Sequence, residues 1–585
     1  MGLLRNFAVE AGIVRDDTEL AAKPRWTDSN RIRFVRGLAQ KLGGWTRRTS
    51  LQYDGICRGM LAWLDNANVG RILLGTTEKL LVQQSQTLFD ITPLRDSGTL
   101  AANPFTTTAG SAIVTVADSN HGGIVGSRVI FAGAAAVGGI TPDGEYVIQT
   151  AETNEYTIEH SSAATSSATG GGASVTYEYL INIGRVDATQ GSGYGVGTYG
   201  TGTWGTPRTS FILLPPRTWT LDQFGQDVVA CPRDGSIYRW QRDTNTRAQI
   251  LANAPTENIG IMVTDERHLV ALGAGGDKMK VEWASQDAPT VWSPSDQNTA
   301  GGRALVGGSE ILFGLRTRGT NLIFTDASAW TMTFVGGLDV FGFRQVAAGA
   351  SGIVSPRAAC DVNGIVYWMG NNDFYFFDGR VRRIRRSKEN RRFVFDNLNQ
   401  QQKNKTFVFC NTLFSEIWWF YVSATATEID RYIKVNYDTW DWDVGVLDRT
   451  AAIDLGVFPN PILAAPDRHL YDHESGVDAA GEPMNEYIRS SPIEISQGGQ
   501  VVDIDSFMPD FKNLVGAVDV TLFTRYYPQG KEEQVDVGPV ISGTEQLEPE
   551  RASGRQASLR IGSDVLGTNW RLGAPKMEVT PGGER

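Results

Sequence analysis

Short apolar runs separated by turn-forming Gly, Asp and Asn recur along residues 212–472, and they set the pattern of the chain. Each unit holds an apolar run, a tight turn and a second run rich in aromatic residues. The clearest copies are residues 364–370 with 373–379, and 416–421 with 431–437. Apolar runs of this length bounded by turn residues predict buried β-strands.

The spacing of these units indicates a β-propeller. Their centres are Val229, Leu269, Leu322, Val366, Trp418 and Ile462. Subtraction of these numbers gives spacings of 40, 53, 44, 52 and 44 residues. An all-strand unit of about 40 to 50 residues has the size of a propeller blade, which must stack on its neighbours to bury both faces. With a similar unit centred near Ile72, the sequence predicts about six or seven blades.

Shifts in composition divide the chain further. The segment 95–184 is rich in Ala, Gly, Thr and Ser and predicts a separate β module, with a partly disordered loop as the alternative. Strands alternate again after 491. We predict an N-terminal arm and strand at 1–50, a first propeller unit at 51–94, an inserted β module at 95–184, a Gly-rich linker at 185–211, the main β-propeller at 212–490, and a C-terminal β domain with a tail at 491–585. One helix is predicted at 396–405, with Asp396 as its N-cap.

Composition agrees with an all-β class and limits the function. Hydrophobic residues make up 41 %, charged residues 20 %, and the chain has 65 Gly and 15 Trp. The net charge of −11 disfavours sequence-specific DNA binding. The four cysteines are scattered, which predicts free thiols. No run of about 18 apolar residues predicts a membrane span.

The candidates for chemistry are weak. His469 and His473 have the spacing of a zinc-protease helix, but they lie in a predicted strand and lack the glutamate of that motif. Asp438, Asp441 and Asp443 lack the glycine and closing glutamate of a calcium loop. No nucleophile elbow or phosphate loop is present. We therefore predict no catalytic activity, no metal site and no cofactor.

A dense basic run stands out in this acidic chain. Residues 380–392 hold seven Arg and one Lys against one Glu. The run fits a solvated loop, a subunit interface or a phosphate-contacting surface. We predict that it faces a neighbouring subunit or an outer partner. The candidate interface residues are Arg380, Arg382, Arg383, Arg385, Arg386, Arg391 and Arg392.

Motifs at both ends of the chain resemble the tail nozzle proteins of short-tailed bacteriophages, which are also called packaged-DNA stabilisation proteins. The N-terminal motif spans residues 26–45 and the C-terminal motif residues 554–573. The residues that carry the resemblance are Trp26, Asn30, Arg33, Phe34, Gly37, Gly43, Gly44, Arg555, Arg560, Trp570 and Arg571. Together with several blades, these motifs extend the resemblance over most of the chain.

The resemblance implies a structural protein of the virion tail, made in the host cytoplasm. It implies a homo-oligomeric ring, a hexamer in the family, that contacts the adaptor and portal side and the tail fibre or spike proteins. Double-stranded DNA would be retained and then pass through the ring without sequence-specific binding. An alternative is a propeller module that binds a glycan or a receptor, and it predicts that Trp418, Trp419, Trp440 and Trp442 line a pocket. A propeller hydrolase is the third hypothesis.

Overall fold

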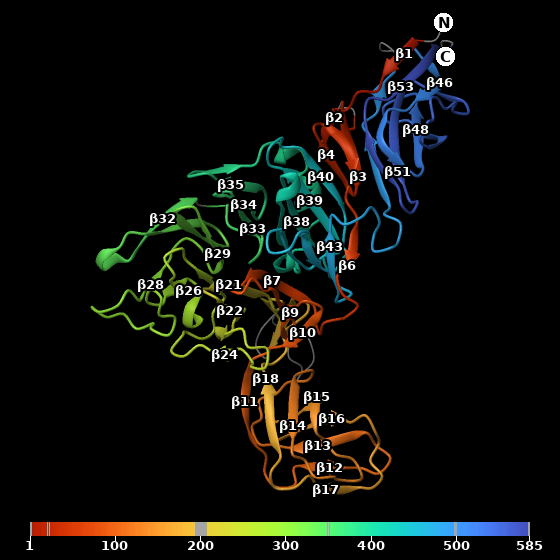
Figure 1. The fold of residues 1–585 in the computed structure, drawn as a ribbon. Helices are drawn as coiled ribbons and strands as arrows, with labels where there is room; N and C mark the ends of the chain where they lie inside the picture. Colours follow the sequence, from red (N-terminus) through yellow and green to blue (C-terminus); the bar gives the residue numbers. More distant parts are fainter. Residues whose placement is uncertain are drawn as a thin grey trace. The chain divides into compact units, whose positions relative to one another are not determined.

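The computed structural model describes residues 3–582 except 20, 23, 194–207, 348, 350 and 496–499. The protein is all-β, as predicted, and is built largely from four-stranded antiparallel sheets (Figure 1). The chain divides into two compact units. We call Tyr53–Leu305 the middle unit, and Met1–Gln52 with Val306–Arg585 the terminal unit.

The middle unit contains three meander sheets of four consecutive strands each. The first consists of β7 (Cys57–Leu64), β8 (Gly70–Thr76), β9 (Leu80–Gln84) and β10 (Thr87–Asp90). The second consists of β21 (Trp219–Phe224), β22 (Asp227–Pro232), β23 (Tyr238–Trp240) and β24 (Gln249–Ile250). The third consists of β25 (Gly260–Val263), β26 (Leu269–Leu272), β27 (Lys280–Trp283) and β28 (Gly301–Ala304), with the short 3₁₀ helix η1 (Ala274–Gly276) between β26 and β27.

The terminal unit contains three further meanders of the same kind. The first consists of β29 (Ile311–Thr317), β30 (Thr320–Thr325), β31 (Ala329–Phe334) and β32 (Phe341–Ala347). The second consists of β33 (Ala359–Val362), β34 (Ile365–Met369), β35 (Phe374–Phe377) and β36 (Val381–Arg383). The third consists of β37 (Phe407–Asn411), β38 (Glu416–Tyr421), β39 (Arg431–Asn436) and β40 (Trp442–Val446). The helical segments of this unit are η2 (Gly337–Asp339), η3 (Ser387–Glu389), α1 (Arg391–Phe395), η4 (Lys403–Lys405) and η5 (Thr412–Phe414).

A seventh four-stranded sheet is completed by the N-terminal part of the chain. It consists of β41 (Ala451–Ile453), β42 (Ile462–Ala464), β43 (Leu470–His473) and β6 (Trp45–Arg47). Strand β6 pairs antiparallel with β43, so residues more than 400 positions apart share one sheet. Within each unit, the first strand of one meander contacts the first strand of the next, as β7 does with β21 and β33 with β37. Such packing is typical of propeller blades.

The second strand of each blade is the most deeply buried. Every residue of β22, β26, β38 and β42 is buried, because each lies in the middle of its sheet with packed side chains on both faces. Each predicted unit centre, Ile72 included, lies in the second strand of its sheet. The apolar runs of the sequence therefore correspond to these central strands.

Within the segment 95–184, the structure has a β module that belongs to the middle unit. Its eight strands have the order β11-β18-β14-β15-β16-β13-β12-β17. They are β11 (Leu94–Thr99), β12 (Phe105–Thr107), β13 (Ile113–Ala117), β14 (Arg128–Ala132), β15 (Gly144–Ala151), β16 (Glu155–Glu159), β17 (Ala168–Gly170) and β18 (Thr176–Leu180). In Figure 1 these strands run from orange to yellow and form a compact body. The first and last strands, β11 and β18, pair with each other.

The expected linker 185–211 is partly an antiparallel pair. Strand β19 (Thr189–Gly193) pairs with β20 (Arg208–Leu214). The Gly-rich repeat between them, 194–207, lies outside the described residues.

The N-terminal segment is not an arm. Its strands β1 (Leu3–Asn6), β2 (Glu10–Ile13), β3 (Arg25–Asn30), β4 (Ile32–Val35) and β5 (Leu38–Lys41) belong to three sheets with C-terminal strands. The C-terminal partners in these sheets are β44 (Glu486–Ser490), β45 (Ile493–Glu494), β46 (Val502–Met508), β47 (Phe511–Val515), β48 (Val518–Arg525), β49 (Glu533–Val540), β50 (Ala552–Gly554), β51 (Gln556–Ser563), β52 (Asn569–Leu572) and β53 (Lys576–Pro581). Because β44 pairs with both β3 and β51, the C-terminal sheets begin before residue 491.

The helix prediction is also corrected. Helix α1 spans Arg391–Phe395, and Asp396 is its C-cap rather than its N-cap. The carboxylate of Asp16 accepts hydrogen bonds from the backbone N–H groups of Arg392 (2.6 Å) and Phe393 (2.8 Å). A distant acid therefore caps the helix, which local sequence could not indicate. Among the described residues, no helix is long and apolar enough to cross a bilayer.

Candidate functional site

The basic segment, residues 380–392, contains β36 and η3 and ends in the first turn of α1, in the terminal unit. Two buried residues fix its path. Ile384 packs into the hydrophobic core, and Ser387 donates a hydrogen bond to the buried Asp373 carboxylate at 2.7 Å. Asp373 also lies 3.3 Å from Nε of Arg383. The segment is therefore a shaped surface element that holds its arginines in place.

Most of the predicted interface arginines are exposed. The side chains of Arg382 and Arg383 are 57 % and 56 % exposed. Each makes a single contact with a carboxylate, Arg382 with Asp378 at 3.6 Å and Arg383 with Asp373 at 3.3 Å. The segment's other exposed arginines are Arg380, Arg385 and Arg392, and Arg391 is half-buried. The pair of Arg382 with Asp378 is exposed and contributes little to stability, whereas Arg383 pairs with a buried carboxylate. Both guanidinium groups are themselves exposed and can contact a partner.

Arg386 has a different role. Its guanidinium pairs with Glu389 at 3.2 Å and with Asp441 at 3.0 Å, and it donates a hydrogen bond to the backbone carbonyl of Ala11 at 3.2 Å. Glu389 in turn accepts a hydrogen bond from Arg25 at 2.8 Å. Arg386 therefore joins the basic segment to β40 and to the N-terminal strands, and it is largely occupied within the chain.

The N-terminal motif forms the centre of a buried ionic cluster. Arg33 in β4 is 1 % exposed, and its guanidinium lies 2.5 Å from Glu474 and 3.3 Å from Glu416. It also lies over the ring of Phe414, 3.5 Å from the centroid. Burial would lower the Arg33 pKa, but the two carboxylates outweigh it and raise that pKa above its ordinary value. Arg33 thus remains a cation inside the protein.

A second cation extends this cluster into β39. Nζ of Lys434 donates a hydrogen bond to Glu416 at 2.7 Å and lies 3.4 Å from the Asp443 carboxylate. Asp443 accepts a hydrogen bond from the hydroxyl of Ser29 in β3 at 2.5 Å. Burial raises the pKa of Asp443 to about 6 in spite of Lys434. Sequence analysis missed this cluster, although single charges inside the apolar strands β38 and β39 were a usable signal.

The C-terminal motif meets the N-terminal one directly. Arg571 donates a hydrogen bond to the backbone carbonyl of Val35 at 2.5 Å. Trp570 is fully buried and its indole N–H donates to Glu486 at 3.2 Å. Lys41 lies 3.4 Å from the same carboxylate. The two motifs are therefore one packed framework, although they stand more than 500 residues apart.

The remaining motif residues are structural too. The side chain of Asn30 donates to the carbonyl of Asn485 at 2.6 Å and accepts from the N–H of Val446 at 2.9 Å. A side chain at Gly44 would place its Cβ 2.5 Å from the backbone of Asp478. Trp26 and Phe34 are buried. Gly37 occupies a turn with φ +80°, and Gly43 packs against Glu474. Arg555 lies over the ring of Tyr527, and Arg560 lies over the ring of Tyr487.

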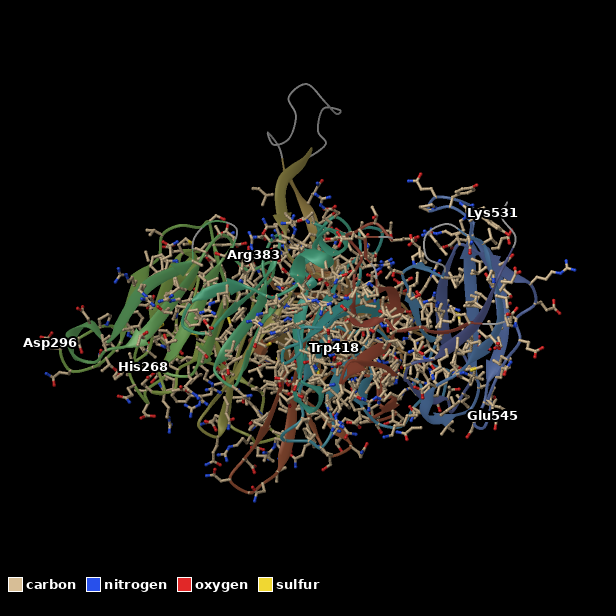
Figure 2. All side chains as sticks on the ribbon, turned by 90° about the horizontal axis from the view of Figure 1, so that it is seen from above. His268, Asp296, Arg383, Trp418, Lys531 and Glu545 are labelled. Atoms are coloured by element: carbon tan, nitrogen blue, oxygen red, sulfur yellow. The ribbon has the colours of Figure 1, made fainter. Side chains whose placement is uncertain are left out.

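The aromatic residues that would form a glycan pocket lie mostly in the core. Trp418, Trp419 and Trp442 are 4 %, 0 % and 0 % exposed, and Figure 2 shows Trp418 among densely packed side chains. Trp440 is half-buried beside Phe376, with Arg385 above its ring. Glycan recognition through these four rings is therefore not favoured.

The weak chemical candidates are dispersed as well. His473 accepts a hydrogen bond from Nε of Arg449 at 3.0 Å, and burial holds its pKa well below the ordinary range. The ring of His469 lies 3.3 Å from Asp467. Among the described residues, no group of three or more His, Cys, Asp and Glu side chains has the arrangement of a metal site.

One cavity of the middle unit holds two carboxylates, as a hydrolase would require. Its volume is about 620 Å³, and Asp227 and Asp287 are part of its lining. Each carboxylate is already paired with arginine, Asp227 with Arg239 at 2.5 Å and Asp287 with Arg267 at 2.6 Å. The two carboxyl groups of a glycoside hydrolase act directly on the scissile bond, whereas both carboxylates here are engaged by arginine side chains. Asp227 and Asp287 are therefore poor candidates for a hydrolase pair.

Comparisons with known proteins add only distant likenesses. The sequence matches no protein-family model and no curated protein. Among solved structures, phage phi92 endosialidase is similar at 11 % identity and a TM-score of 0.20, over 55 % of this chain and 52 % of that one. The N-terminal domain of Nup159 is similar at 9 % identity and a TM-score of 0.27, over 46 % of this chain and 79 % of that one. PorZ of Porphyromonas gingivalis is similar at 9 % identity and a TM-score of 0.30, over 89 % of this chain and 82 % of that one. These likenesses are too distant to bear on function.

Proposed function

We propose that the protein is a non-enzymatic subunit of a short-tailed phage tail nozzle. It assembles as a homo-oligomeric ring that extends the portal and adaptor channel, retains packaged DNA and lets it pass. One observation carries this proposal. The two motifs of the resemblance, at opposite ends of the chain, are hydrogen-bonded to each other through Arg571 and Val35 and form a buried framework. Motif residues that hold the two ends of the chain together support a structural role for the protein.

The distribution of charge supports self-association. The exposed guanidinium groups of the basic segment belong to a chain with a net charge of −11. A neighbouring copy therefore offers an acidic surface that attracts them. A DNA channel works best without such a cluster in its wall, because each phosphate contact strengthens retention. In the ring, the basic segment contacts the adjacent copy.

Electron microscopy and mass photometry of the purified full chain test this proposal. We expect closed rings of uniform subunit number at low ionic strength. The triple variant Arg380→Glu, Arg382→Glu, Arg383→Glu should shift the population to monomers, with the fold unchanged by circular dichroism. A matched control changes the exposed Lys512, Lys531 and Lys576 to Glu and alters the net charge equally.

The outcomes separate the two parts of the proposal. Monomers of the unaltered chain at micromolar concentration would reject the ring. Rings of the arginine variant as abundant as those of the unaltered chain would reject the basic segment as the interface. Equal loss of rings in the lysine control would show that net charge, and not the position of the arginines, governs assembly.

A further inference from the structure

A cavity in the middle unit is lined by arginine and apolar side chains. Its volume is about 410 Å³. Four segments form its walls. They are the turn at Ile124, the chain at Ile183–Arg185 that leaves β18, the stretch at 215–217 that follows β20, and the turn at 233–234 after β22. A backbone hydrogen bond from the N–H of Arg217 to the carbonyl of Arg185, 2.9 Å long, joins two of these walls.

The cavity has an excess of positive charge. Three arginines, Arg185, Arg217 and Arg233, and one acid, Asp234, contribute to its lining. Nε of Arg233 lies 3.8 Å from the Asp234 carboxylate, a distance too long for a hydrogen bond. The side chain of Arg233 is 5 % exposed and that of Asp234 59 % exposed. The acid is therefore largely solvated, and the lining holds three cationic side chains against one acid.

Arg217 brings a buried, unsatisfied donor to the cavity. Its Nη1 is buried and has no hydrogen-bond partner in the part of the chain that the structure describes. Burial lowers the pKa of Arg217 to about 10, and the opposing effect of Tyr238 is weaker. A guanidinium has five donor hydrogens, and a buried donor without an acceptor is destabilising. An acceptor from outside the chain would satisfy this group.

We propose that this cavity binds a small organic anion, a carboxylate or phosphate group attached to a compact apolar body. The planar guanidinium fork matches the two oxygens of either group. Ile124, Ile183 and Pro216 provide apolar wall for the remainder of the ligand. The volume lies within the range of small-molecule sites. All residues of this site belong to the middle unit, whereas the basic segment belongs to the terminal unit.

Isothermal titration calorimetry of the full chain with benzoate, phenyl phosphate and benzamide tests the site. Benzamide has the same ring and nearly the shape of benzoate without its charge. We expect benzoate, phenyl phosphate or both to bind with a stoichiometry near one, and benzamide not to bind. The stronger of the two anions identifies whether the natural ligand has a carboxylate or a phosphate. Absence of binding by both anions, or equal binding of benzamide, would overturn the proposal.

Three variants locate the binding. Arg217→Gln should weaken anion binding at least about tenfold, because a charge-assisted hydrogen bond is lost. Asp234→Asn should tighten it about twofold to fivefold by removing a competing charge, a gain that misfolding cannot produce. Arg267→Gln alters an exposed arginine of another cavity and should leave affinity unchanged. Anion binding that Arg217→Gln leaves intact would place the ligand elsewhere and reject this site.

Discussion

The buried charges of the terminal unit give single residues an influence over its packing. Arg33 is held between Glu416 and Glu474, and Lys434 between Glu416 and Asp443. Removal of one partner from such a cluster leaves an uncompensated buried charge, which costs about 3–5 kcal/mol. An arrangement of this kind tolerates little displacement of β4 against β38, so it fixes how the N-terminal strands are placed.

Glu486 should make the stability of the terminal unit depend on pH. Burial raises its pKa from an ordinary value of 4.5 to about 7, against the opposing effect of Lys41. Between these values the folded state binds more protons than the unfolded state. The contribution of Glu486 to stability is therefore full below pH 4.5 and is lost as pH rises through about 7, by about 3 kcal/mol at most.

The comparison of Glu486→Gln with the unaltered protein isolates this effect. Gln resembles the protonated acid at every pH. The free energy of unfolding of the unaltered protein, measured with urea by tryptophan fluorescence, should fall relative to the variant between pH 5 and pH 8. Glu482→Gln, at an exposed position nearby, should track the unaltered protein. A difference between Glu486→Gln and the unaltered protein that stays constant over this range would contradict the assignment.

At the scale of elements, the central strand of each blade was predictable and its partners were less so. Ile72, Val229 and Trp418 mark strands whose residues are nearly all buried, so their sequences are continuous apolar runs. Outer strands such as β24 and β36 have exposed positions and weaker patterns. Periodicity identifies an element when burial is uniform along it.

The errors at this scale have one cause, which is contact between distant segments. Helix α1 begins where Asp16 supplies its cap, and β1, β3, β5 and β6 pair with strands more than 400 residues away. The ionic cluster around Arg33 depends on the same contacts. The basic segment was evident from its local composition, but the internal role of Arg386 was not. Local sequence does not contain the partner of a long-range pair.

The pairing of β6 with β43 should control the last blade. Thr46 faces Asp472 in this ladder and is exposed. The change Thr46→Pro removes a backbone donor and distorts the strand, and it should destabilise this sheet by about 1–3 kcal/mol. Hydrogen exchange measured by mass spectrometry should show loss of protection in residues 470–473.

Ser50→Pro provides the control for this change. Residue 50 is exposed and lies just beyond β6, outside any strand. It should leave exchange at 470–473 unchanged. If Thr46→Pro also leaves that exchange unchanged, β6 does not stabilise the blade.

At the scale of the molecule, the inserted module should be separable from the rest of the middle unit. Its terminal strands pair at Leu94 and Leu180, so the two points of attachment are adjacent. Two ion pairs tie it to the first blade, Arg128 to Glu78 and Lys79 to Glu145, both at 2.9 Å. Lys79 is buried, but the carboxylate partners of Lys79 and Arg128, which are Glu145 and Glu78, are partly exposed. Loss of either ion pair should lower the free energy of unfolding by about 1 kcal/mol or less.

Replacement of residues 95–179 by a Gly-Gly turn tests this separation. The shortened protein should remain folded, with an unfolding midpoint close to that of the full chain and unchanged hydrogen exchange in β21 and β22. As a control, the isolated module 94–180 should fold by itself, since it has its own apolar core. Aggregation of the shortened protein, with the isolated module folded, would show that the blade needs the module.

The sheet shared by β6 and β43 also orders events during translation. Residues 3–47 are synthesised long before residue 470, and the distant partners of β1, β3, β5 and β6 lie at or beyond that residue. A nascent chain must therefore keep β1, β3, β5 and β6 without their distant partners while most of the protein is synthesised, although β2 can already pair with β3 and β4 with β5. Such exposed strands invite association with other chains. The opening segment, rather than the blades, is where a molecular chaperone would be needed, and a chain released early would have no last blade at all.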